Sequence, residues 1–161
     1  MKVICLWLHP KLPKPNTKIL KEFIKDVCSC INFNIPKGTI ISVSFLGVEQ
    51  MCDINQTFLN HNYLTDVICF DYMNYDDFSK DDEIAIELLL SPDIALQRAN
   101  EHSVPYDYSV ELALYIIHGL LHAAGYKDKL NDDRLKMRKK ENDIISTLSE
   151  KYILNKLFLL N

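Results

Sequence analysis

The sequence contains no hydrophobic run long enough to form a membrane-spanning helix. The apolar stretch from Ile84 to Leu90 is too short to cross a bilayer, and it includes the acidic residue Glu87. The first fifteen residues, MKVICLWLHPKLPKP, also lack the small-residue cleavage site of an export signal, and we interpret them as a strand followed by a loop. These absences predict a cytoplasmic protein that does not act at a membrane.

The cysteine pattern lacks the features of a disulfide-bonded or zinc-ribbon protein. The chain has five cysteines, an odd number, and no Cys-x-x-Cys pair occurs among them. In a chain without an export signal, this pattern argues against a disulfide framework and against zinc held by cysteines alone. We therefore expect the thiols to be buried side chains without a chemical role.

The chain also lacks an excess of positive charge. It has 18 lysines and arginines against 22 acidic residues, a formal net charge of −4, which excludes a general polyanion binder. Its basic residues are nevertheless clustered, in KDKLNDDRLKMRKK at residues 127–140 and among the lysines from Lys11 to Lys25, whereas residues 71–83 are strongly acidic. Such runs are usually solvated surfaces, but a basic rim around a site would favour nucleic acid.

The apolar patterns that are present predict an α/β (α+β) fold. Residues 1–161 read as a single domain, in which about four strands form a mixed sheet packed with about five helices. Strands are expected at residues 1–8, 39–46, 66–72 and 83–90. Helices are expected at residues 17–32, 47–60, 91–102, 107–125 and 131–152.

Two of these expected helices differ in their apolar pattern. The helix at residues 107–125 is apolar almost all the way round, which places it at the centre of the domain, and Gly125 is suited to end it in a left-handed conformation. The helix at residues 47–60 has a single apolar stripe, which is typical of a helix with one buried face. That stripe consists of Val48, Met51, Ile54, Phe58 and Leu59.

The stretch HGLLHAAGYKDK in the central helix has the spacing of a metal site. His118 and His122 are four residues apart, so their side chains share one helix face about 6 Å apart along the axis and can bind one ion. Gly125 lets the chain turn back, so that Asp128 can offer a carboxylate to the same ion. Three protein ligands leave a coordination position for water, as a catalytic zinc site requires.

Other interpretations of these residues stay open on spacing alone. Two histidines on a buried helix can be hydrogen-bonded core residues, and Asp128 can be a helix cap. A zinc peptidase would have glutamate directly after the first histidine, where this chain has Gly119, so that class is disfavoured. Glu111, seven residues before His118, could orient a ligand histidine, accept a proton from water, or simply form a cap or a surface salt bridge.

The same stretch resembles the signature H-G-x-L-H-x-x-G-Y-D-H of the YbeY family of rRNA maturation factors. VELALYIIH also has a glutamate seven residues before the first histidine, INQTFLNHNYLTDVICF resembles the segment L-N-x-x-Y-R…T-D-V-L-S-F, and DEIAI resembles the strand G-D-I-x-I. The similarity runs from about residue 50 to residue 130. The signature is matched at His118, Gly119, Leu121, His122, Gly125 and Tyr126.

The resemblance implies a metal-dependent enzyme that acts on RNA. It implies a single-strand-specific, zinc-dependent endoribonuclease, with one zinc ion per chain, that matures the 3′ end of small-subunit rRNA and serves ribosome quality control. The expected partners are single-stranded and ribosomal RNA and ribosomal particles. The sequence does not indicate an oligomeric state.

The resemblance also implies roles for particular residues. His118, His122 and Glu111 are the expected catalytic residues, and His118, His122 and Asp128 are the expected metal ligands. The expected RNA cleft is lined by Thr65, Asp66, Arg98 and Lys127.

Three departures from the family pattern matter most, and the first falls in the last D-H of the signature, which is Lys127-Asp128 here. The last histidine of the signature is Asp128, the arginine of the Y-R pair is Leu59, and the glycine of G-D-I is Asp82. Leucine cannot pair with a phosphate, and a carboxylate ligand makes a zinc-bound water less acidic. These departures motivate an alternative, a ribosome-assembly factor that binds RNA or protein and keeps the metal site but has weak or lost catalysis.

Overall fold

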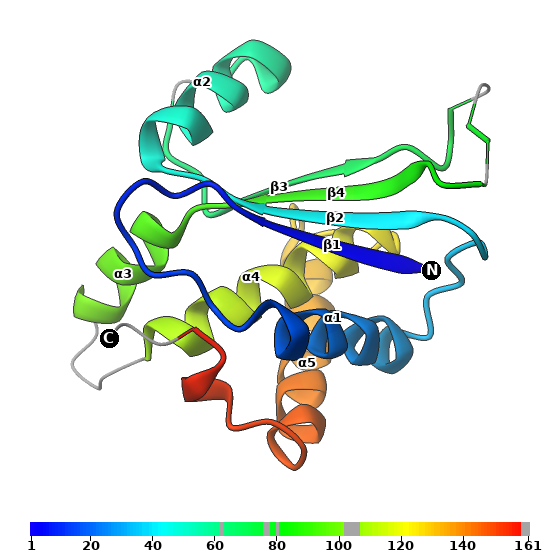
Figure 1. Cartoon of the computed structure of the whole chain (residues 1–161). Coiled ribbons are helices and arrows are strands. Elements are labelled where there is room, and N and C mark those ends of the chain that lie inside the picture. Colours follow the sequence, from blue (N-terminus) through cyan, green and yellow to red (C-terminus); the bar gives the residue numbers. More distant parts are fainter. Residues whose placement is uncertain (62, 76–77, 80, 102–106, 159–161) are drawn as a thin grey trace.

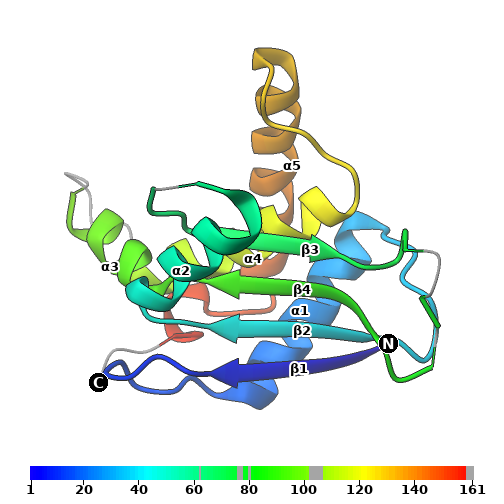
Figure 2. The ribbon, with the colours of Figure 1, turned by 90° about the horizontal axis from the view of Figure 1, so that it is seen from above.

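The four predicted strands form one mixed sheet. In a computed structural model, which describes residues 1–61, 63–75, 78–79, 81–101 and 107–158, the strand order is β1-β2-β4-β3. Strands β1, β2 and β4 are parallel to one another, and β3 runs antiparallel to β4, as Figure 2 shows from above. The strands are β1 (Lys2–Trp7), β2 (Ile40–Phe45), β3 (Val67–Asp71) and β4 (Ile84–Leu90).

The five predicted helices are also present. Asn16 caps the first of them, since its side-chain oxygen accepts hydrogen bonds from the backbone N–H groups of Lys18 and Ile19. The expected end of the third helix at His102 lies outside the described residues. The helices are α1 (Thr17–Ile31), α2 (Val48–Leu59), α3 (Pro92–Glu101), α4 (Tyr108–Ala123) and α5 (Asn131–Ser149), followed by a short 3₁₀ helix η1 (Leu154–Lys156).

The helices cover the two faces of the sheet unequally. Figure 1 shows α1, α3, α4 and α5 on one side of the sheet and α2 alone on the other. The main hydrophobic core lies on the side with four helices and includes Phe23, Phe45, Leu88 and Ile116. A smaller cluster beneath α2 consists of Leu46, Met51, Ile68 and Leu89.

Helix α4 is the central helix of the domain, as its pattern predicts. It contacts β3, β4, α1, α3, α5 and η1. Gly119 permits its close approach to the sheet, because a Cβ atom there would lie 2.8 Å from Leu88 Cδ2 and 3.2 Å from Val67 Cγ2. Past the helix end, Gly125 has a φ of +92°, the left-handed conformation expected of a helix terminator.

The apolar stripe of α2 is mostly not buried, which corrects the prediction. Met51 is the only fully buried member of the stripe, whereas Phe58 is 68% and Leu59 41% exposed. The cause is the sheet face that α2 covers, which presents polar side chains such as Ser42 and Ser44 between its apolar ones. Met51 and Asn55 are the buried residues of this helix, so its apolar stripe does not coincide with its buried face.

The last long helix ends at Ser149, three residues before its expected end at Tyr152. Tyr152 is instead drawn into the core, where its ring packs edge-on against Phe23 at a centroid distance of 5.4 Å. Its hydroxyl donates a hydrogen bond to Asp26. A buried aromatic anchor thus ends the helix in favour of a turn.

Neither a disulfide nor a membrane-spanning helix occurs in the described part of the chain. All five cysteines are free thiols, of which Cys28 is fully buried and the others are half-buried. Burial raises the pKa of Cys5 to about 11 and that of Cys69 to about 12, so both thiols are protonated near neutral pH. These thiols are poor nucleophiles, in line with a structural role.

We predict that Gly119→Ala destabilises the domain, although alanine is the better helix former. Overpacking costs about 1–3 kcal/mol and helix propensity returns up to about 1 kcal/mol, so a net loss of about 1 kcal/mol is expected in urea unfolding. Leu88→Ala should be less costly in the Gly119→Ala background than in wild type, because it makes room for the new methyl group. Additive losses in the double variant would contradict the proposed contact.

Candidate metal centre

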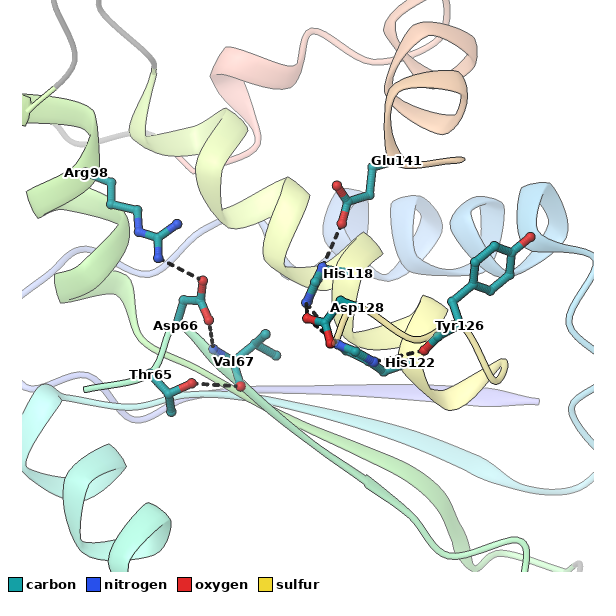
Figure 3. A network of polar contacts seen from close by, with 9 residues as sticks. All are labelled: Thr65, Asp66, Val67, Arg98, His118, His122, Tyr126, Asp128 and Glu141. Carbon is teal, nitrogen blue, oxygen red and sulfur yellow. Dashed lines mark hydrogen bonds and ion pairs between the residues drawn. The ribbon is translucent and has the colours of Figure 1, made fainter. Parts of the chain in front are cut away.

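Three side chains converge where α4 meets the loop beyond it. His118 and His122 come from the last turns of α4, and Asp128 comes from the segment after Gly125 (Figure 3). The two Nε2 atoms lie 3.0 Å apart, and Asp128 Oδ2 lies 3.7 Å from Nε2 of His118 and 3.6 Å from that of His122. The three predicted metal ligands therefore face one common point.

These distances fit a single zinc-sized ion. Zinc bonds of about 2.0–2.1 Å in a tetrahedron place neighbouring ligand atoms about 3.3–3.4 Å apart. The measured separations of 3.0, 3.6 and 3.7 Å bracket that value. Two imidazole nitrogens and one carboxylate oxygen are also a donor set that zinc commonly accepts, and three ligands leave a position open.

Hydrogen bonds at the far side of each imidazole support the same assignment. His118 Nδ1–H donates to Glu141 Oε1 of α5 at 2.6 Å, and His122 Nδ1–H donates to the carbonyl oxygen of Tyr126 at 3.0 Å. With both protons on Nδ1, each neutral ring directs its Nε2 lone pair toward the other ring. The two lone pairs and the Asp128 carboxylate therefore face the same point, an arrangement that a single cation could bridge.

The partner of His118 corrects one interpretation of Glu111. The carboxylate that orients His118 belongs to Glu141, which the sequence reasoning did not select. Glu111 is seven residues away on the same helix, about 10 Å along the axis, and is too distant to hydrogen-bond to that imidazole. Its proposed role as a proton acceptor is untouched by this geometry and stays a prediction.

The charge around His118 makes its protonation a competitor of metal binding. Burial lowers the pKa of His118, but its hydrogen bond to Glu141 and the charges of Glu141, Asp66 and Asp128 outweigh it, and the pKa is raised above its ordinary value. An imidazolium ion cannot bind a metal. Metal affinity is therefore expected to fall in mild acid.

A cavity of about 560 Å³ opens beside the ligands, between α3, α4 and α5. Glu111, which is only 7% exposed, forms part of its floor. Tyr115 lies near Arg98, whose guanidinium carbon is 6.0 Å from the ring centroid. The described residues that line the cavity are Asp66, Arg98, Glu111, Leu114, Tyr115, His118, Arg138 and Glu141.

The cavity brings together only part of the expected RNA cleft. Asp66 and Arg98 both line it and form an ion pair at 3.4 Å. Thr65 is adjacent in the chain, but its hydroxyl donates to the carbonyl of Val67 (Figure 3) and does not line the cavity. Lys127 lies apart, beside a smaller cavity of about 270 Å³ behind Gly125.

Comparison with known proteins agrees with this geometry. The model of the family described as "Endoribonuclease YbeY" matches residues 11–149. The chain belongs to the YbeY family. YbeY endoribonucleases of Azobacteroides pseudotrichonymphae and Porphyromonas gingivalis are 36% and 35% identical to it, over 88% and 86% of this chain and 94% and 85% of theirs. A third, from Flavobacterium psychrophilum, is 41% identical over 64% of this chain and 68% of its own.

A solved structure supports the fold independently. The solution structure of a Thermotoga maritima protein superposes with a TM-score of 0.55 at 22% identity, over 92% of this chain and 93% of that one. The α/β architecture is thus shared across most of the chain. YbeY membership itself supports an endoribonuclease role.

The structure also shows how two of the departures from the YbeY pattern are accommodated. Asp128 replaces a histidine, yet its Oδ2 atom is almost equidistant from both imidazoles, so the third donor atom is retained. Asp82 replaces a glycine and keeps a φ of +57°, which aspartate tolerates better than most residues. Leu59 has no such compensation, since its exposed side chain carries neither charge nor hydrogen-bonding group.

We predict that Glu141→Gln weakens zinc binding about tenfold. The substitution removes the negative charge that increases the basicity of His118, and such outer partners typically affect metal affinity 10–100-fold. Competition with a chromophoric chelator measures the effect. Asp143→Asn is the matched control, because Asp143 is an exposed carboxylate on the same helix that is not part of the cavity. Equal losses in both variants would assign the effect to net charge alone.

Proposed function

We propose that this chain is a zinc-dependent endoribonuclease specific for single-stranded RNA. The observation that carries the proposal is the convergence of His118, His122 and Asp128 on one point beside a cavity that two arginines and three carboxylates line. We further propose that it acts in the cytoplasm on ribosomal RNA, at the 3′ end of the small-subunit rRNA and in ribosome quality control. Family membership supports the nuclease role, and the resemblance in the signature segment supports the ribosomal one.

The residues around the point that the three candidate ligands face would have different roles in the reaction. His118 and His122 hold their lone pairs toward it because Glu141 and the Tyr126 carbonyl fix their tautomers. Zinc, when bound, supplies Lewis acidity at a phosphoryl oxygen and activates water. The carboxylate of Glu111 lies in the same cavity as His118, where it can accept a proton from a water or a ribose hydroxyl.

The fold restricts which RNA can reach this site. The ligands lie at the junction of α4 and its following loop, beside the cavity between α3, α4 and α5. A double helix presents its phosphates on a rigid cylinder and cannot bend one strand into a cavity, whereas a single strand can. The difference in flexibility between the two forms supports the proposed preference for single strands.

The principal test is cleavage of a labelled single-stranded RNA by purified protein with and without zinc. Cleavage should require zinc and should be lost in the double variant His118→Ala, His122→Ala. His61→Ala is the control, because His61 is an exposed histidine in the turn after α2 and lies outside the cavity. Undiminished cleavage by the double variant would refute the proposal.

Metal content provides a second, activity-independent test. Elemental analysis of the wild-type protein should give about one zinc per chain, since one set of three donors was found among the described residues. Asp128→Ala should bind zinc more weakly, because only two imidazoles remain. Full zinc occupancy in Asp128→Ala under chelator competition would show that Asp128 is not a ligand.

A second candidate function is favoured by Leu59. The residue is 41% exposed at the end of α2 and cannot hold a phosphate, so the chain could bind ribosomal particles while cleaving RNA weakly. In that case the combined change Leu59→Arg, Asp128→His should raise cleavage strongly. Wild-type protein with high activity, unchanged in this variant, would exclude the second candidate.

A further inference from the structure

Arg138, at the edge of the candidate site, is a cation that has no partner among the described residues. It lies on α5, three residues before Glu141, and both side chains line the cavity that contains His118. It is exposed, and among the described residues it makes no hydrogen bond or ion pair. Its guanidinium group therefore keeps all of its donors for a ligand.

Three other cations of α5 are already engaged. Lys136 pairs with Asp133 at 3.9 Å, and the ammonium group of Lys140 donates to the carbonyl of Cys30 at 3.0 Å. Arg134 donates to the side chain of Asn131 within the first turn of the helix. Arg138 differs from these three both in lacking a partner and in lining the cavity.

A second guanidinium lies on another wall of the same cavity. Arg98 of α3 is held by Asp66 and lies over the ring of Tyr115, so its position is fixed. Figure 3 shows Arg98 and Glu141 on different sides of His118. The lining also contains three carboxylates, Asp66, Glu111 and Glu141, of which the buried Glu111 would repel an anion that entered deeply. An anion is therefore best accommodated at the rim, where Arg138 is exposed.

Phosphate is the anion that this arrangement suits. A guanidinium presents paired N–H donors in a planar fork that matches two phosphate oxygens, and it stays charged at every accessible pH. The cavity is open to solvent, so it can take one phosphate of a longer chain.

We propose that Arg138 binds a phosphate of single-stranded RNA that flanks the cleaved linkage, with Arg98 providing the second positive charge. This proposal rests on the proposed function, since it takes the substrate to be RNA. Arg138 is then a substrate-binding residue and does not ligate the metal.

The first test measures RNA binding without cleavage. A fluorescently labelled single-stranded oligoribonucleotide is titrated with chelator-treated protein at several salt concentrations. For one lost phosphate contact, the slope of log affinity against log salt should fall in magnitude by about 0.7 in Arg138→Ala. Lys139→Ala is the matched control, because Lys139 is an exposed neighbour outside the cavity lining and should leave the slope unchanged.

The second test separates substrate binding from chemistry. In the zinc-loaded protein, Arg138→Ala should raise the KM for single-stranded RNA about tenfold, as expected for a lost charge-assisted hydrogen bond, with a smaller effect on kcat. Arg138→Lys keeps the charge but loses the fork, so it should recover part of the affinity. Zinc content and thermal unfolding should match wild type in all three variants.

The outcomes distinguish this proposal from the proposed function. Cleavage by wild type with unchanged KM and salt slope in Arg138→Ala would overturn the phosphate site and leave the nuclease intact. If the slope of log affinity against log salt depends on Arg138 but the protein never cleaves RNA, the phosphate site is supported and the proposed nuclease activity is refuted. Absence of RNA binding by the chelator-treated wild type, or equal effects of Arg138→Ala and Lys139→Ala, would also overturn the site.

Discussion

The 3.0 Å separation of the two Nε2 atoms of His118 and His122 is the constraint on which the candidate site depends. The Nδ1 atom of each ring forms a hydrogen bond on the side away from the other ring, His118 with the Glu141 carboxylate and His122 with the Tyr126 carbonyl. These hydrogen bonds fix the orientation of both Nε2 lone pairs. The protein thereby holds the donor atoms of both rings toward one point. Such preorganisation favours metal binding, because the ligands need not be ordered when the ion arrives.

The rest of the fold supplies the rigidity that this geometry requires. Helix α4 is buried along most of its length, and Gly119, directly after the first ligand, lets the helix lie close to β3 and β4. A larger residue there would lift the ligand-bearing turns off the sheet. The turn at Gly125 then returns the chain, so that Asp128 meets the same point. The metal site is thus a consequence of how tightly one helix is packed.

Much of this could be predicted from local sequence patterns, and what could not shares a physical cause. The strands, the central helix and the ligand triplet depend on spacings of at most ten residues, which helix geometry converts directly into proximity. Glu141 and Arg138 belong to a helix whose crossing over α4 brings residues more than twenty positions apart into contact. No periodicity within α5 marks the face that meets the site, and both residues sit in a charged run that reads as a solvated surface.

The stripe of α2 was predicted wrongly for a related reason. Its spacing is that of a buried helix face, but burial depends on the surface opposite, and the sheet offers only a small apolar area there. Phe58 and Leu59 therefore remain exposed.

The departures from the YbeY pattern acquire a common explanation from the geometry. A metal site tolerates the exchange of histidine for aspartate as long as one donor atom reaches the same point, and a tight turn tolerates aspartate for glycine at positive φ. Leucine at position 59 carries no charge and lies on α2, on the other side of the sheet from the cavity, so a phosphate contact at the cavity must come from other residues. Arg98 and Arg138 are the cations that line it, and only Arg138 lacks a partner within the described chain. Arg138 is therefore the residue around the cavity that is best placed to contact a phosphate in a chain that has leucine at position 59.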